Sequence, residues 1–180
     1  MSASTTRYSA PTIALHWITL ILIAAVYATA ELKGMVPKES PEAGLMRMLH
    51  SSCGLTILGL TAIRLIARLF SRAPAIVPEP AAWERLFAVL MHVALYALLL
   101  ALPLLAWYGI SAVGGTPHVW GIALPTLTGE DKELGRSVLG THKLIANIGY
   151  GLIALHVLAA LRHHYASKDN TLLRMLPNRG

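Results

Sequence analysis

The chain has 180 residues, of which 55% are hydrophobic and only 13% are charged, and its net charge is +6. Soluble domains have roughly 25% charged residues, so this composition argues against a soluble protein and for a membrane protein. The basic residues lie between apolar segments and form no patch or arm, which argues against nucleic acid as a partner. The single cysteine, Cys53, excludes an internal disulfide, and without a CxxCH motif covalently attached c-type haem is excluded as well.

Four apolar segments follow one another along the chain, at approximately 13–30, 49–67, 86–113 and 141–165. A helix needs about 20 residues to span a bilayer, so each segment is a candidate span. Arg64 and Arg68 lie toward the end of the second segment, where we expect their long side chains to reach the membrane interface. The sequence therefore predicts an all-α fold, with residues 1–180 forming a single membrane domain of four helices.

The charges between the segments predict an orientation. Nine Lys and Arg residues would lie on the side of the two termini and the second loop, and six on the side of the first and third loops. Acidic residues increase the difference in net charge between the two sides, because three lie on the first side and six on the second. The positive-inside rule then places both termini in the cytoplasm. The first segment also resembles a secretory signal, with Arg7 before it and small residues at its end, but it is long for one and contains His16 and Trp17.

Histidines are the unusual feature of the apolar segments. An ionisable side chain within a membrane is costly and usually functional, yet five of the eight histidines fall in these segments: His16, His50, His92, His142 and His156. His142 and His156 are 14 residues apart, so on one helix they share a face and lie about 21 Å apart along the axis. This spacing puts one histidine near each leaflet, as two stacked haems require.

The predicted topology supplies a partner for each of these two histidines. His16 lies near the inner end of the first segment, at the depth of His156, and His50 lies near the outer end of the second, at the depth of His142. We therefore expect His16 and His156 to bind one haem iron toward the inner side. His50 and His142 are expected to bind a second iron toward the outer side. Neutral imidazoles on iron avoid the cost of a charge in lipid.

Two glycines and one further histidine belong to this hypothesis. Gly149 lies midway between the histidines of the fourth segment and Gly54 lies one turn from His50, so both are expected to leave room for a porphyrin. His92 has no partner left. It can line a quinone pocket, replace His16 as a ligand, or form a hydrogen bond to a neighbouring helix, and we prefer the last.

The remaining candidates are expected to be structural. His163 and His164, at the end of the fourth segment, are expected at the solvated interface, and His118 is expected to be a loop residue. Cys53 is interpreted as a small core residue. Pro103, inside the third segment, is expected to kink that helix.

Several short motifs resemble the bacterial cytochrome b561 family, and most closely its members described as superoxide oxidases, which pass electrons from superoxide to ubiquinone. The resemblance covers nearly the full length and is most specific in the tail. The matching residues are Ile13-Ala14-Leu15-His16-Trp17, His50-Ser51-Ser52-Cys53-Gly54, Ala146-Asn147-Ile148-Gly149-Tyr150, His163-His164-Tyr165 and Lys168-Asp169-Asn170-Thr171-Leu172-Leu173-Arg174-Met175.

The resemblance implies an integral membrane four-helix bundle with two b-type haems stacked across the bilayer of the bacterial inner membrane. It carries the haem ligands over to His16, His50, His142 and His156, and it implies ubiquinone as substrate or bound acceptor. The residues beside His142 depart from the family pattern, which has Trp before this ligand and an acidic residue after it. Here they are Thr141 and Lys143, and this difference bears on the substrate.

Three functions are compatible with these observations. The first is oxidation of superoxide with reduction of quinone, in which basic residues on the outer side would attract the anion: Lys33, Lys38, Arg47 and Lys143. The second is a haem anchor that relays electrons between a soluble dehydrogenase and quinone. The third is a histidine-lined transporter for metal ions or protons. The motifs of the tail favour the first.

Overall fold

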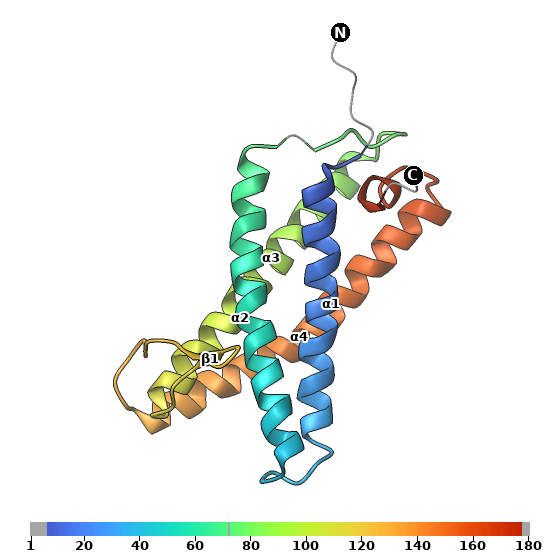
Figure 1. Ribbon diagram of the computed structural model, residues 1–180. Coiled ribbons are helices and arrows are strands. Elements are labelled where there is room, and N and C mark those ends of the chain that lie inside the picture. The colour runs from blue at the N-terminus through green and yellow to red at the C-terminus, as the bar shows by residue number, and fades with distance from the viewer. Residues whose placement is uncertain (1–6, 72, 178–180) are drawn as a thin grey trace.

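The computed structural model of the protein describes residues 7–71 and 73–177. Within them lie four long helices: α1 (Ala10–Lys33), α2 (Pro41–Leu69), α3 (Ala82–Ala112) and α4 (Lys132–Tyr165) (Figure 1). A small antiparallel hairpin, β1 (His118–Val119) and β2 (Ile122–Ala123), lies between α3 and α4. A short 3-10 helix, η1 (Leu173–Met175), lies in the C-terminal segment.

All four helices are long and apolar enough to cross a membrane, with stretches of mean hydropathy between 1.5 and 2.3. Large apolar side chains such as Ile21, Phe87 and Leu144 are exposed on the bundle, as they are where helices face lipid. The predicted all-α, four-helix membrane bundle is confirmed. The chain is a multi-pass membrane protein.

Side chains cap the first N–H groups of α2 and α4. The Ser40 hydroxyl accepts a hydrogen bond from the Ala43 N–H at the start of α2, where Pro41 needs no partner. The Asp131 carboxylate accepts one from the Leu134 N–H at the start of α4. These caps fix where α2 and α4 begin, and therefore where His50, His142 and His156 lie along the two helices.

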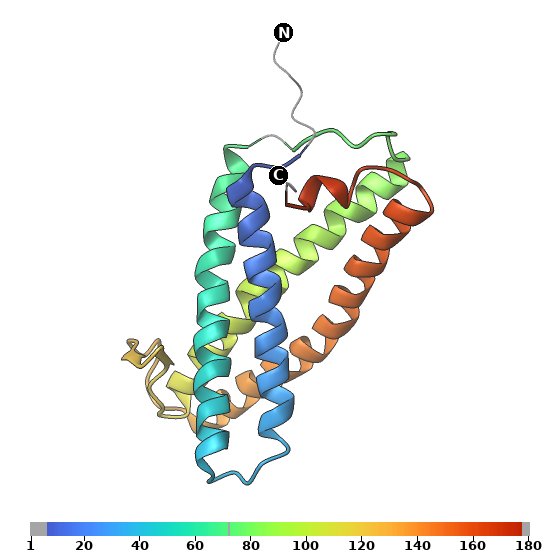
Figure 2. The ribbon, with the colours of Figure 1, turned by 45° about the vertical axis from the view of Figure 1, so that its right-hand side comes forward.

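The helices form two pairs that differ in how they pack. α1 and α2 lie side by side along their length, whereas α3 and α4 are close near their connecting loop and separate toward the other end (Figures 1 and 2). Gly109 and Gly135 make the close approach possible, because a Cβ on Gly135 would lie 2.8 Å from the Val113 nitrogen. We call the end with the α1–α2 and α3–α4 loops the loop end. The opposite end, where both described ends of the chain lie, is the terminal end.

The C-terminal segment, residues 166–177, lies across the terminal end, where α3 and α4 have separated (Figure 2). The Tyr8 N–H donates to the Arg174 carbonyl at 3.1 Å, and the Trp17 Nε1–H donates to the Met175 carbonyl at 2.7 Å. Asn170 exchanges two hydrogen bonds with Val77 of the α2–α3 loop. The segment therefore joins α1, the α2–α3 loop and α4 into one closed end.

Candidate functional site

The structure brings His50 of α2 and His142 of α4 together near the loop end. Their ring centres are 6.3 Å apart, and the ring planes are inclined by 71°. His50 Nδ1 lies 3.0 Å from the Val26 carbonyl, and His142 Nδ1 lies 2.9 Å from the Leu102 carbonyl. A carbonyl only accepts, so each Nδ1 carries the hydrogen and each Nε2 keeps a free lone pair. Both rings are thus held in the form that binds a metal through Nε2.

His16 of α1 and His156 of α4 come together near the terminal end. Their ring centres are 6.5 Å apart, and the planes are inclined by 62°. His92 of α3 is a third member, with its ring centre 5.6 Å from that of His156. The expected bond from His92 to a neighbouring helix is wrong, because its Nδ1 lies 2.5 Å from the carbonyl of Ala88, one turn earlier on its own helix. The side chain instead faces the space beside His156.

Neither site holds a metal ion by side chains alone. Residues 7–71 and 73–177 contain no group of three or more His, Cys, Asp or Glu placed to hold one. Two facing imidazoles suit a metal that brings its other ligands with it, as iron does in a porphyrin. A metal–imidazole bond of about 2.05 Å and a ring centre about 1.1 Å behind the bonding nitrogen put two opposed ring centres roughly 6.3 Å apart. Both pairs have this separation, whereas His92 and His156 are closer.

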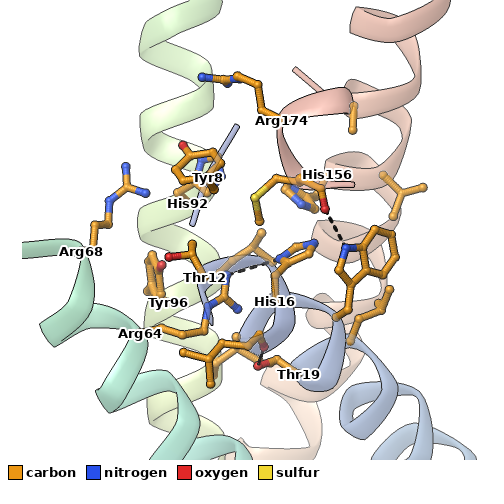
Figure 3. A pocket seen from close by; sticks show the side chains of 18 of the residues that line it. Tyr8, Thr12, His16, Thr19, Arg64, Arg68, His92, Tyr96, His156 and Arg174 are labelled. Atoms are coloured by element: carbon orange, nitrogen blue, oxygen red, sulfur yellow. Dashed lines mark hydrogen bonds between the residues drawn. The ribbon is translucent and has the colours of Figure 1, made fainter. Parts of the chain in front are cut away.

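A cavity of about 310 Å³ surrounds the histidines of the terminal end (Figure 3). Its polar lining includes His16, His92 and His156 together with Arg64, Arg68 and Arg174. On the loop-end side of the histidines the lining is apolar, with Ile23, Leu99 and Ile153. The cavity therefore has one charged end and one apolar end.

Arg64 does not reach to the membrane interface as expected. Its Nη2 lies 3.3 Å from His16 Nδ1, and its guanidinium carbon lies 5.9 Å from the centre of the Tyr96 ring (Figure 3). In the sequence, Arg64 stands out only as a residue near a helix end. Its cost at membrane depth was the signal that it serves a site.

Arg174 enters the same cavity from the C-terminal segment and was missed in the sequence. It is 7% exposed, its Nη1 donates to the Pro74 carbonyl, and its guanidinium carbon lies 5.6 Å from the centre of the Tyr8 ring. Its Nε is buried and, within the described part of the chain, has no hydrogen-bond partner. A buried charged donor without a partner is costly, so the cavity lacks an acceptor.

His163 of α4 helps to hold the C-terminal segment against the terminal end of the bundle. Its expected place at the solvated interface is therefore wrong. Its Nδ1 lies 2.6 Å from the carboxylate of Asp169, which is only 4% exposed. Burial alone would raise the pKa of Asp169, but hydrogen bonding by Thr171 and the contact with His163 outweigh it and lower the pKa. Asp169 is therefore ionised at neutral pH and fixes the C-terminal segment to α4. The neighbouring His164 packs its ring against Tyr165.

The two glycines singled out in the sequence differ in their surroundings. Nothing lies within 4 Å of a Cβ built on Gly54, so the space one turn from His50 is open, as expected. Gly149 does not face open space. A Cβ there would overlap the Tyr27 hydroxyl, which donates to the Ala146 carbonyl at 2.8 Å, and would touch Leu98. Gly149 therefore makes room for Tyr27 between the two histidine pairs, and the expected role beside a porphyrin is wrong.

The expected basic cluster of the loop end is present in part. Lys33, Lys38 and Arg47 line one pocket in the α1–α2 loop, and Arg47 donates to the Lys38 carbonyl at 3.1 Å. Lys143 is not among its lining residues and is exposed on α4.

The other residues singled out in the sequence are structural. Cys53 is buried with 5% exposure, which confirms its place in the core. Pro103 is buried inside α3. His118 is exposed in β1, next to Trp120, whose N–H donates to the Ser52 hydroxyl and ties the hairpin to α2.

A four-helix membrane bundle with two opposed histidine pairs defines the class of protein as a membrane cytochrome. The comparison with known families makes this specific, because the model described as prokaryotic cytochrome b561 matches residues 7–178. The chain belongs to this family.

Curated relatives match almost end to end. The "Cytochrome b561 homolog 1" of Escherichia coli (strain K12) is 44% identical over 176 residues, which cover 96% of this chain and 98% of the relative. The "Probable superoxide oxidase CybB" of Yersinia pestis is 36% identical over 173 residues, covering 96% and 97%. The "Cytochrome b562" of Cereibacter sphaeroides is 31% identical and covers 94% of each chain.

Membership of this family implies a b-type haem and electron transfer within the membrane. The residues present fit such a group, because the chain offers imidazoles in opposed pairs, an open face at Gly54 and a cavity with uncompensated donors. The protein is a membrane electron-transfer protein with oxidoreductase-type activity.

Proposed function

We propose that the protein oxidises superoxide and reduces ubiquinone, using two b-type haems in a single membrane domain. The observation that carries this proposal is the pair of opposed histidine sites, one at each end of the bundle. When bound, haem supplies one-electron chemistry, which suits a one-electron donor and a two-electron acceptor. Two superoxide ions become two molecules of dioxygen, while one quinone takes up the two electrons and two protons to become quinol. A relative named as a probable superoxide oxidase supports this choice of substrates.

The proposed ligands are His50 and His142 for the loop-end haem, and His16 and His156 for the terminal-end haem. The ring separations of 6.3 and 6.5 Å suit imidazoles on opposite sides of one iron. If each pair of histidines held one iron, no position on it would be free for oxygen to bind. The chain therefore favours electron transfer without a bond between substrate and iron.

His92 is proposed to lie beside the terminal-end haem without binding its iron. Its ring centre is 5.6 Å from that of His156, which is too short for ligands on opposite sides of one metal. His92 is thus a neighbour of the site with a hydrogen bond to its own helix.

The loop end is proposed to face the outside of the bacterial inner membrane, with both termini in the cytoplasm. Lys33, Lys38 and Arg47 line one pocket around the α1–α2 loop at this end and provide a local attraction for a small anion. The charge count of the loops supports the same orientation. Superoxide would then give up its electron on the side of the His50–His142 pair.

Steady-state reduction of ubiquinone by the purified protein, driven by a superoxide generator, tests this function. We expect quinol to form at a rate that depends on the protein and disappears when superoxide dismutase is added. Haem reduction without quinone turnover, or no response to superoxide, would contradict it. Co-purification of a soluble dehydrogenase in stoichiometric amount, with turnover only in its presence, would replace this function with that of a haem anchor.

A further inference from the structure

Three arginines, which we call the arginine cluster, line the charged end of the terminal-end cavity: Arg64, Arg68 and Arg174 (Figure 3). Arg64 and Arg68 are four residues apart on α2 and so lie one turn apart on the same face. Arg174 is 106 positions further along the chain than Arg68 and is placed here by the folding of the C-terminal segment. Three cations from two separate elements thus converge on one cavity.

Within the described residues, no carboxylate of the chain compensates this charge. The ion pairs at the terminal end join Arg85 to Glu79, Arg162 to Glu84 and His163 to Asp169. The contacts of Arg64 and Arg174 are neutral instead, with the rings of Tyr96 and Tyr8. The buried Nε of Arg174 has no partner in the same set of residues. Of the three arginines, Arg174 is buried, Arg64 is half-buried and Arg68 is exposed. A buried cation is stable only when it is paired, so the end of the cavity with Arg174 and Arg64 suits an anionic ligand.

The contact between Arg64 and His16 points to the position of that ligand. An arginine only donates hydrogen bonds, so His16 Nδ1 accepts in this contact and its hydrogen must then be on Nε2. A histidine that binds iron through Nε2 has its hydrogen on Nδ1. The two arrangements exclude each other. Binding of iron by His16 therefore requires Arg64 to take another acceptor nearby.

We propose that the arginine cluster binds the two propionate carboxylates of the terminal-end haem, and that Arg64 moves from His16 to one of them. This inference rests on the proposed haem between His16 and His156. Guanidinium groups match carboxylates in shape and form paired, charge-assisted hydrogen bonds with them. The porphyrin edge without carboxylates would then face Ile23, Leu99 and Ile153, the apolar end of the cavity. The C-terminal segment is in this way part of the haem site, because it supplies Arg174.

Infrared difference spectra between the oxidised and reduced holoprotein test this assignment. The haem is labelled with ¹³C in its propionate carboxylates, so that only their bands move with the label. Arg64→Gln and Arg174→Gln are compared with Arg162→Gln, which removes the same charge at the same end but from an ion pair outside the cavity. We expect the labelled bands to shift in the first two variants and to be unchanged in the third.

The reduction potential of the terminal-end haem gives a second readout. Loss of a nearby positive charge favours the oxidised iron, so we expect the ratio of oxidised to reduced terminal-end haem to rise about tenfold at fixed potential, which corresponds to about 59 mV. The loop-end haem is the internal reference. Arg64→Lys keeps the positive charge and is expected to have most of the original reduction potential. It serves as the control that separates loss of the charge from misfolding in Arg64→Gln.

Two kinds of outcome would overturn the proposal, and they can be told apart. If the labelled bands and the potential are unchanged in Arg64→Gln and Arg174→Gln while both haems are present, the cluster does not bind the propionates. If the bands and the potential are unchanged but the variants lose tightly bound phospholipid, the arginine cluster binds a lipid phosphate instead. If His16→Ala retains both haems, the proposed haem position itself is wrong.

Discussion

The two histidine pairs have nearly the same separation but are held in different ways. At the loop end, the Nδ1 atoms of His50 and His142 are bonded to backbone carbonyls of Val26 and Leu102, each on a neighbouring helix. At the terminal end, His16 faces the guanidinium of Arg64, and a third histidine, His92, lies within the same space. The first pair is fixed by the bundle itself. The second is placed by side chains that would have to rearrange if the proposed haem bound there.

Helix packing explains why the two ends differ. Gly109 and Gly135 hold α3 and α4 together at the loop end, so the space there is set by contacts between helices. The same helices separate toward the terminal end, where the C-terminal segment closes the opening and adds Arg174 (Figure 2). The loop-end site therefore depends on the four helices alone. The terminal-end site also depends on a segment that follows them.

The largest expected effect is the loss of one site without the other. His142→Ala removes one proposed haem ligand from the loop end, and His142 is not among the residues that line the terminal-end cavity. We expect the haem content of the purified protein to fall from two per chain to one, as measured by the pyridine haemochrome assay. His118→Ala, an exposed histidine in β1, is the control and should retain both haems. Retention of both haems in His142→Ala would contradict the pairing.

A second pair of variants separates the histidines of the terminal end. Because His16 has the separation from His156 that opposed ligands need and His92 does not, we expect His16→Ala to lose the terminal-end haem and His92→Ala to keep it. Haem content and the electron paramagnetic resonance signal of each oxidised haem measure the difference. If His92→Ala loses the terminal-end haem and His16→Ala retains it, then His92 and not His16 is the ligand opposite His156.

The pairing of histidines could be predicted from the sequence because it follows from topology. Four apolar segments fix the direction of each helix, and position along a helix then fixes the depth of His16, His50, His142 and His156. The structure brings the same partners together. Cys53 was placed in the core on similar grounds, since small apolar residues in a span are usually buried.

Residues that act across separate elements could not be placed in this way. Arg174 reaches the cavity because the C-terminal segment folds back over the terminal end. Hydrophobic periodicity predicts helices but does not predict that a segment folds back in this way. Arg64 was expected at the interface because depth along a helix does not tell which way a side chain turns. Gly149 has the right position for a porphyrin contact, but Tyr27 from another helix occupies that space.

The third prediction concerns the residue that lies between the two sites. A methyl group on Gly149 overlaps the Tyr27 hydroxyl, so Gly149→Ala should displace the Tyr27 side chain, break its hydrogen bond to the Ala146 carbonyl and destabilise the bundle by about 1–3 kcal/mol. Thermal unfolding in detergent should show a lower midpoint, with both haems lost together. Gly151→Ala, two residues along the same helix and without any atom within 4 Å of the added carbon, should be neutral or slightly stabilised. An equal loss of stability in both variants would show that helix flexibility, and not the contact with Tyr27, is responsible.

The smallest effect should be confined to the loop end. Because a Cβ on Gly54 meets no atom of the chain, Gly54→Ala should leave the folding of the bundle unchanged. The same methyl group would lie one turn from His50, on the face where the proposed porphyrin stands, and should weaken retention of the loop-end haem several-fold. The purified variant is diluted into detergent, and the loss of each haem with time is followed by its visible spectrum. The rate of loss of the loop-end haem measures the effect. Gly59→Ala, equally free of contacts on the same helix but five residues further along, should retain the haem as the unmodified chain does. Equal retention in both variants would mean that the porphyrin does not approach α2 at Gly54, and that the loop-end haem lies closer to the other helices.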